Sequence, residues 1–330
     1  MKPSLGQLSA AGIAVASIAM PLSPVAMAQD QYPSRQIRVV VPFPAGGTTD
    51  MLARVFGQRM SQAFGQPVIV ENMGGAGGSV GAENIARAAP DGYALLFHNL
   101  TFSATTTSLQ FAGRAKHGLD DFAPVSLAAN VPIIILASAK VDAADLKAFT
   151  ALAKAAKEPM FYGSTGPGSI MNLTAEIYKR DAGIKLDHVP FRGAAPLVQE
   201  LIAGRIHLGG DQLSTSLEHV RGGSMKPMAM LSAARISLLP NVATVREQGF
   251  PNLEFAGWNG YFAPAKTPAA VIAKLQGAIK AAAAEQDVAK RLAEVGAQAV
   301  GSTPAELGTL VREQMAKMKP YVEDLKLIVQ

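Results

Sequence analysis

Short apolar runs alternate with Gly- and Pro-rich turns and amphipathic stretches along most of this chain, and that alternation restricts its fold more than any other feature. In the first part of the chain, strands are predicted at residues 36–41, 68–70 and 93–97. A helix is predicted from Asp50, with Thr48 or Thr49 as its N-cap, and another at residues 82–89. Strands that alternate with helices indicate an α/β fold, with mainly parallel sheets flanked by helices.

The same alternation restarts in the middle of the chain, which indicates a second sheet. Its strands are predicted at residues 131–136, 160–162, 188–191, 206–208 and 228–231. Ser169 is expected to cap one helix, and Pro196 to take the first position of a later one. Near the C-terminus, Thr303 and Glu306 form a capping box around Pro304. The expected lobes are residues 29–130 plus 251–330 for lobe 1 and residues 131–250 for lobe 2.

The start of the chain has the order of a secretory signal peptide. Lys2 supplies a positive charge, residues 8–20 are mostly apolar, and an Ala-Met-Ala triplet ending at Ala28 provides a cleavage site. The apolar run is short for a membrane span, and Pro21 and Pro24 follow it. The alternative is an N-terminal anchor that is retained. We expect a signal peptide at residues 1–28, cleaved after Ala28, and export of the mature chain.

The composition argues against several classes of function. The chain has 330 residues, 49% of them hydrophobic, and no cysteine, so disulfides, thiolate metal sites and Cys nucleophiles are excluded. Thirty Lys and Arg against 25 Asp and Glu give a formal net charge of +5, and the basic residues are scattered, so no nucleic-acid partner is expected. The sequence holds no P-loop or dinucleotide fingerprint, and its five histidines lack metal-ligand spacing. We therefore expect neither a metal nor a cofactor.

Two loops share the features of an anion-binding site. Residues 42–50 and 163–169 each follow a predicted strand, are rich in Gly and Pro, and lead into a helix N-terminus. Such an N-terminus presents unpaired N–H groups and about half a positive charge. Neither loop holds Lys or Arg, so backbone and hydroxyl dipoles would have to bind the anion. The alternative is that both are ordinary strand–helix turns, with glycines for packing.

Two residues allow competing interpretations. Asp50, in the first turn of its helix, either interacts with the helix dipole or accepts a hydrogen bond from a ligand. Ser79 lies in the pattern G-x-S-x-G, which is typical of a nucleophile elbow, but a run of glycines separates it from the preceding strand. An exported serine hydrolase that uses Ser79 is therefore an alternative to a binding protein.

Seven segments, taken in order, resemble the Bug family of periplasmic receptors for tripartite tricarboxylate transporters. They are YPSRQIR (32–38), VPFPAGGTTD (41–50), VENMGGAGG (70–78), APDGY (89–93), GSTGPGS (163–169), VPFRG (189–193) and GWNGYFAP (257–264). Together they cover nearly the whole chain after the signal peptide. This resemblance implies a two-lobed periplasmic binding protein, type II-like, whose cleft closes on a small organic acid.

The resemblance also implies which residues bind the ligand. Loops from opposite lobes would hold one carboxylate, with ordered waters completing its contacts. The residues placed at the ligand are Phe43, Ala45, Gly46, Gly47, Thr48 and Asp50 in lobe 1, and Ser164, Thr165, Ser169 and Asp211 in lobe 2. The chain departs from the family after Phe97, where HNLTF (98–102) stands in place of a Thr/Ser-rich segment, and before Asp211, where Gly209 and Gly210 stand in place of a bulky apolar residue. Both departures are expected to reshape the far end of the pocket.

The resemblance further implies the partners. These are a di-, tri- or aromatic carboxylate and the membrane permease subunits that receive it, with the receptor itself a periplasmic monomer without catalytic residues. A ligand-dependent partner of a membrane sensor remains an alternative, because its fold and pocket would be the same.

Overall fold

The structure is a computed structural model that describes residues 32–327. The predicted signal peptide of residues 1–28 and its cleavage site lie outside the described residues. The described residues from Pro33 onward form one compact unit, to which the following description applies. Within residues 32–327, no helix combines the length and the apolar character needed to cross a membrane.

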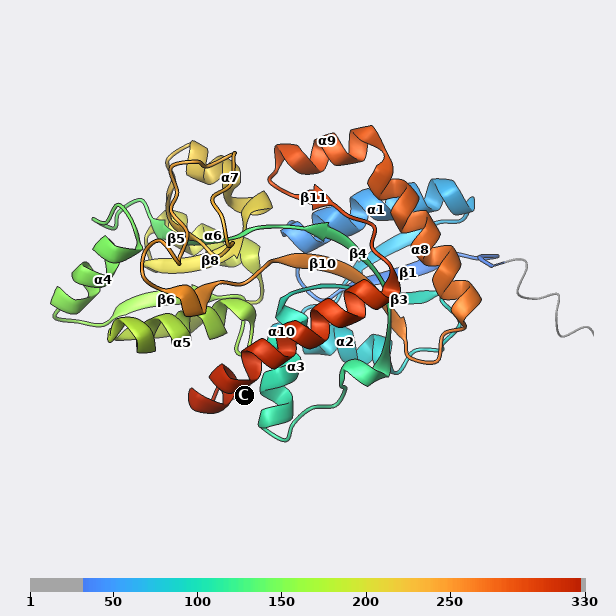
Figure 1. The fold of residues 1–330 in the computed structure, drawn as a ribbon, viewed down its shortest axis with the longest axis horizontal. Coiled ribbons are helices and arrows are strands. Elements are labelled where there is room, and N and C mark those ends of the chain that lie inside the picture. Colours follow the sequence, from blue (N-terminus) through green and yellow to red (C-terminus); the bar gives the residue numbers. More distant parts are fainter. Residues whose placement is uncertain (1–31, 328–330) are drawn as a thin grey trace, which may run out of the picture. The chain divides into compact units, whose positions relative to one another are not determined.

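The first sheet has six strands in the order β11-β4-β10-β3-β1-β2 (Figure 1). The strands are β1 (Ile37–Val41), β2 (Val68–Asn72), β3 (Ala94–Asn99), β4 (Phe122–Asn130), β10 (Trp258–Pro264) and β11 (Gln298–Ala299). β1 is parallel to both β2 and β3. Because β10 is antiparallel to both β3 and β4, these two also run in the same direction.

The second sheet has five strands in the order β7-β6-β8-β5-β9. The strands are β5 (Ile133–Ser138), β6 (Met160–Ser164), β7 (Leu186–Pro190), β8 (Leu208–Gln212) and β9 (Met225–Met230). β6 is parallel to β7 and β8, whereas β5 is antiparallel to β8 and β9. The α/β fold with two sheets flanked by helices is therefore confirmed. Both sheets are mixed rather than mainly parallel, with β10 and β5 as the reversed inner strands.

Both reversed strands follow a crossing of the chain from one sheet to the other. β4 ends at Asn130 and β5 begins at Ile133, while β9 ends at Met230 and β10 begins at Trp258. The two crossings are bonded to each other, because the Val131 N–H donates to the Gly257 carbonyl at 3.0 Å. The two sheets are thus connected by paired backbone segments.

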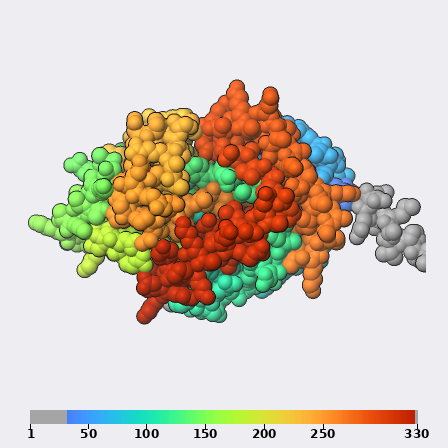
Figure 2. Space-filling model, in the orientation of Figure 1, coloured from blue at the N-terminus to red at the C-terminus, as the bar shows by residue number. Residues whose placement is uncertain are grey.

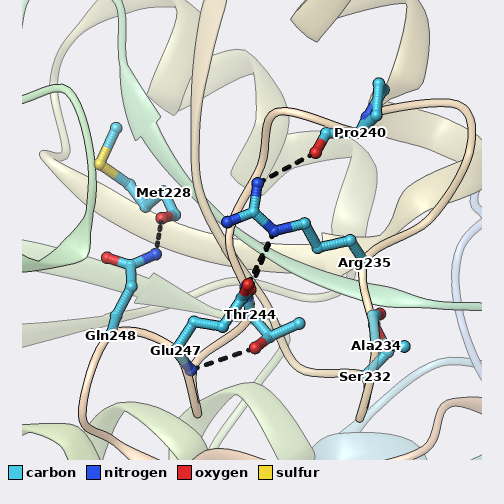
Figure 3. A network of polar contacts seen from close by, with 8 residues as sticks. All are labelled: Met228, Ser232, Ala234, Arg235, Pro240, Thr244, Glu247 and Gln248. Carbon is cyan, nitrogen blue, oxygen red and sulfur yellow. Dashed lines mark hydrogen bonds and ion pairs between the residues drawn. The ribbon is translucent and has the colours of Figure 1, made fainter.

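The longer crossing is held by its own polar network (Figure 3). The Arg235 guanidinium donates to the Glu247 carboxylate at 2.9 Å and to the Pro240 carbonyl at 3.1 Å. The Gln248 amide donates to the Met228 carbonyl of β9 at 2.7 Å. These bonds tie the connection to the edge of the second sheet and fix where the chain returns to β10.

Ten α-helices lie among the described residues. They are α1 (Thr48–Phe64), α2 (Ser79–Ala86), α3 (Thr101–Phe111), α4 (Leu146–Ala155), α5 (Ile170–Ala182), α6 (Ala194–Ala203), α7 (Leu213–Arg221), α8 (Ala269–Ala284), α9 (Gln286–Glu294) and α10 (Pro304–Asp324). The C-terminal helices α8 and α10 pack on β4 of the first sheet. In the space-filling view the red surface of α10 borders the green surface of α3, and these two helices are in contact (Figure 2).

Helix starts that depend on neighbouring residues alone agree with the sequence prediction. The Ser169 hydroxyl accepts from the Asn172 N–H, and Thr303 and Glu306 form the expected capping box around Pro304. The prediction for α1 was wrong, because its N-cap is Gly47, without a side-chain cap.

Three other predicted boundaries shift in the structure. Pro196 is the third residue of α6 rather than the first, because the helix already begins after Gly193. α2 begins at Ser79, directly after the short 3₁₀ turn Ala76–Gly78. The strand predicted at residues 206–208 lies instead at Leu208–Gln212, so the two glycines before Asp211 are inside a strand.

Candidate ligand-binding site

A cavity lies where strands of both sheets end and helices begin, with about 510 Å³ of empty space when its opening to solvent is included. It is lined by Phe43, Gly47, Thr48, Thr49, Asp50, Asn99, Leu100, Thr101, Ile133, Thr165, Ile170, Met171, Ala194, Asp211 and Gln212. These residues belong to the two sheets and their connections, so the cavity is built from both.

The N-termini of five helices contribute to this lining. They are α1 (Gly47–Asp50), α3 (Leu100, Thr101), α5 (Ile170, Met171), α6 (Ala194) and α7 (Gln212). None of the described residues that line the cavity is Lys or Arg. Since each N-terminus carries a partial positive charge, the cavity suits an anion that is bound by dipoles.

Four of these N-termini, those of α1, α3, α6 and α7, receive no hydrogen bond from an N-cap side chain. At α3 the Thr101 N–H donates instead to Asn99 Oδ1 at 2.9 Å, and at α7 the Leu213 N–H donates to the Pro132 carbonyl at 2.8 Å.

The N-caps of α1 and α6 are Gly47 and Gly193, which carry no side chain. α5, in contrast, is capped by its own Ser169. Unpaired N–H groups at a helix start require an acceptor, so α1 and α6 offer the donors most available to a ligand.

Asp50 stabilises the loop before α1 through hydrogen bonds. Its Oδ2 accepts from the Gly46 N–H and from Arg54 Nε, both at 3.1 Å. Its Oδ1 accepts from Asn72 Nδ2 at 3.0 Å and lies 2.9 Å from Arg54 Nη2. Both oxygens therefore already have protein donors, and Gly46 is held at a φ of 89°, where glycine is favoured.

The same contacts determine the charge of Asp50. Burial by itself would raise the pKa of this carboxyl. The hydrogen bonds from Arg54, Gly46 and Asn72, together with the Arg54 charge, outweigh burial and hold the pKa of Asp50 below its ordinary value. Asp50 is therefore ionised at neutral pH and is neutralised by Arg54. These contacts favour the structural interpretation of Asp50 over the ligand-binding one.

The second loop uses its serines internally. The Ser164 hydroxyl donates to the Gly166 carbonyl at 3.1 Å and lies 2.7 Å from His188 Nε2. Ser169 caps α5. Of the hydroxyl residues that the resemblance placed in this loop, only Thr165 lines the cavity.

Asp211 lies at the end of β8, against the start of α7. Its carboxylate accepts from the Gln212 N–H at 2.7 Å and from the Thr215 hydroxyl. Burial raises the pKa of Asp211 to about 7, although both hydrogen bonds oppose the shift. The Thr48 and Thr215 hydroxyls lie 3.3 Å apart, so α1 and α7 meet beside this acid.

The ten residues predicted for the site divide into two groups. Those that line the cavity are Phe43, Gly47, Thr48, Asp50, Thr165 and Asp211. Those that shape its loops without lining it are Ala45, Gly46, Ser164 and Ser169. The second group acts through the backbone turns before α1 and α5.

Sequence reasoning missed the start of α3 and the start of α6. Asn99 Nδ2 donates to Thr49 Oγ1 at 2.9 Å, and Thr49 Oγ1 donates to Asn259 Oδ1 at 3.1 Å, which ties α1 to β3 and β10. A short polar segment directly after a predicted strand, as at Asn99, is a signal that could have been used. The position of Gly193, between a predicted strand and a predicted helix, could have been used in the same way.

Ser79 lacks the geometry of a nucleophile elbow. It begins α2 seven residues after β2 has ended at Asn72, with the turn Ala76–Gly78 between them. Among residues 32–327, no hydrogen bond joins Ser79 to a histidine. A tight strand-to-helix turn and a nearby base are what activate such a serine.

These features define a solute-binding protein of the α/β class, with two sheets that share one anion-suited cavity. Residues 52–327 match the tripartite tricarboxylate transporter family receptor, and the chain belongs to this family, as the sequence predicted. BugT of Bordetella pertussis is 31% identical over 312 residues, which cover 94% of this chain and 94% of BugT.

Two solved structures are similar throughout. MatC from Rhodopseudomonas palustris, with bound malate, is 32% identical with a TM-score of 0.84, covering 88% of this chain and 100% of that one. R. palustris Rpa4515, with adipate, is 30% identical with a TM-score of 0.84, covering 90% of this chain and 99% of that one.

Proposed function

We propose that this chain is a periplasmic receptor that captures a small organic carboxylate in the cavity between its two sheets. The ligand class is a di-, tri- or aromatic carboxylate. The malate and adipate bound to MatC and Rpa4515 support this class. We further propose that the signal peptide is cleaved after Ala28 and that the mature chain delivers its ligand as a monomer to permease subunits.

The observation that carries the proposal is the convergence of five helix N-termini on a cavity whose described lining contains neither Lys nor Arg. A neutral solute gains little from such dipoles, whereas hydrogen bonds to a charged acceptor contribute about 1.5–3 kcal/mol each. Phe43, Leu100 and Ile133 supply apolar walls that exclude water and strengthen these bonds.

The two lobes proposed are residues 29–130 plus 251–330 and residues 131–250. A carboxylate that contacts both α1 and α6 favours the arrangement in which these helices face each other. The paired crossings at Val131 and Gly257 are the segments about which we propose that the lobes move.

The direct test is calorimetric titration of the chain beginning at Gln29 with malate, adipate, citrate and benzoate, and with the diamides of malate and adipate as neutral controls. We expect heat from at least one acid and none from the diamides. If no carboxylate produced heat, or if a diamide bound as tightly as its acid, the proposal would be wrong. Mass spectrometry of an acid that copurifies with the protein would identify the ligand.

We expect carboxylate binding to tighten as the pH falls from 8 to 6. Protonation of Asp211, whose pKa is raised to about 7, removes a negative charge beside the bound anion, while Asp50 stays ionised because its pKa is lowered. If only the protonated form binds, affinity changes by about tenfold over this range. The Asp211→Asn variant is the control and should bind independently of pH; a native protein with a flat profile would contradict the expectation.

A further inference from the structure

A second, smaller cavity adjoins the candidate site beneath α5, with about 300 Å³ of empty space when its part open to solvent is included. It is lined by Ile135, Tyr162, Gly163, Met171, Thr174, Ala175, Tyr178, Leu208, Gly209 and Gly210. We call this cavity the annex. Met171 lines both the annex and the candidate site, so its side chain lies between them.

The polar groups of the annex are already paired within the protein. The Tyr162 hydroxyl donates to Glu176 and accepts from the Asn172 amide. The Tyr178 hydroxyl lies 2.7 Å from Thr150 Oγ1. The Thr174 hydroxyl donates to the Ile170 carbonyl at 2.7 Å.

The glycines of β8 are paired as well, since Gly209 and Gly210 lie opposite Leu136 and Ile135 of β5. A guest in the annex would therefore find few free donors or acceptors. The annex suits hydrocarbon.

Gly210 lets the Met171 side chain pack directly against β8 at the wall of the annex. A Cβ at position 210 would point toward α5 and overlap the sulfur of Met171. Gly209 faces the opposite side of the sheet, where a Cβ would lie 3.0 Å from Leu201 and 3.1 Å from Leu197. The two glycines thus have different roles: Gly209 allows α6 to pack, and Gly210 makes room for Met171.

Met171, the one described residue that lines both cavities, has a flexible side chain. Methionine is unbranched, has three rotatable bonds and adapts its shape readily. A rotation of Met171 would join the annex to the candidate site without moving the backbone of β8 or α5. The larger side chains that line the annex, such as Tyr162 and Tyr178, are held in place by the hydrogen bonds of their hydroxyl groups.

From these observations we infer that the carboxylate bound by this protein carries an apolar extension, which passes Met171 and occupies the annex. The inference rests on the proposed function, because the carboxylate itself would remain at the helix N-termini. It narrows the substrate class to acids with an aliphatic or aryl tail.

The test measures the dissociation constants of butanoate, hexanoate and octanoate, with malate and adipate as references, for the native chain. Affinity is expected to rise about fourfold for each added methylene until the annex is filled. Ala175→Leu places a larger side chain in the annex but not in the candidate site. This variant should lose the gain from butanoate to octanoate and keep the native affinity for butanoate.

Ala182→Leu is the matched control, because Ala182 is also a buried alanine of α5 but does not line the annex. It should keep the native chain-length dependence. If circular dichroism shows that Ala175→Leu folds poorly, Ala175→Val can replace it. Valine fills less of the annex, so this variant should show an intermediate gain in affinity from butanoate to octanoate.

Three results would overturn the inference. If malate or adipate binds but affinity does not rise with chain length, the inference is wrong and the proposed function stands. If Ala175→Leu keeps the full gain, the tail lies elsewhere and the inference is again wrong. If no carboxylate binds at all, the proposed function fails, and the inference fails with it.

Discussion

Replacing Gly47 by Asp is expected to abolish most carboxylate binding while leaving the fold intact. Gly47 is the N-cap of α1, with φ −84° and ψ 168°, and a Cβ there meets nothing within 4 Å. Aspartate is a favoured N-cap in this conformation, so its carboxylate would accept from the first N–H groups of the helix. It would thereby occupy the donors proposed for the ligand and repel a second anion.

The expected loss of affinity is at least about a hundredfold, or ~2.7 kcal/mol, since hydrogen bonds to a charged group contribute about 1.5–3 kcal/mol each. The free energy of unfolding should stay within about 1 kcal/mol of the native value. Calorimetry with the best acid of the panel and urea denaturation measure the two quantities.

Gly47→Asn separates the two causes of the lost affinity, which are the occupied N–H groups and the added negative charge. It occupies the same N–H groups without a charge and should weaken binding less than Asp does. Native affinity in the Gly47→Asp variant would show that the ligand is not held at the start of α1.

Gly257→Ala is expected to cause the largest loss of stability, about 3 kcal/mol or more. A Cβ at this position would overlap the Val131 carbonyl oxygen and lie 2.8 Å from Ile133 Cγ1. The obstacle is backbone in the paired crossing, so no side-chain rotation can relieve it. Relief requires the two crossings to separate, which would break the bond from the Val131 N–H to the Gly257 carbonyl.

Gly277→Ala is the matched control for this substitution. Gly277 lies within α8, is exposed, and a Cβ there meets nothing within 4 Å. Alanine in place of glycine inside a helix should raise the free energy of unfolding by roughly 0.5–1 kcal/mol. Urea denaturation followed by circular dichroism compares both variants; equal stability of Gly257→Ala and the native chain would show that the crossing tolerates separation.

Features whose partners are a few residues apart could be predicted from the sequence. The capping box of Thr303 and Glu306 and the cap at Ser169 each involve groups within one helical turn, so the local sequence determines them. The alternation of strands and helices likewise gave the fold class. The reversed strand β10 was not predictable in this way, because its neighbours β3 and β4 lie more than 120 residues earlier in the chain.

In the candidate site, too, local features could be predicted from the sequence, whereas contacts between distant residues could not. The loop before α1 was predicted from its glycines, but the bonds that fix it, from Asn72 to Asp50 and from Asn99 to Thr49, join separate strands. The strand predicted at residues 206–208 ended before Gly209 and Gly210. In the structure both pair with β5, and their missing side chains serve the packing of Leu201 and Met171.

The α1 and α6 helices begin with N–H groups that have no side-chain cap, and this has a consequence for how such a receptor can change. Every residue except proline carries an amide, so almost any point mutation leaves these donors in place. The ability to bind a carboxylate therefore depends on the path of the backbone. Most substitutions change only the side chains that surround the remainder of the ligand. A scaffold of this kind can acquire new specificities by small steps without passing through an inactive ancestor.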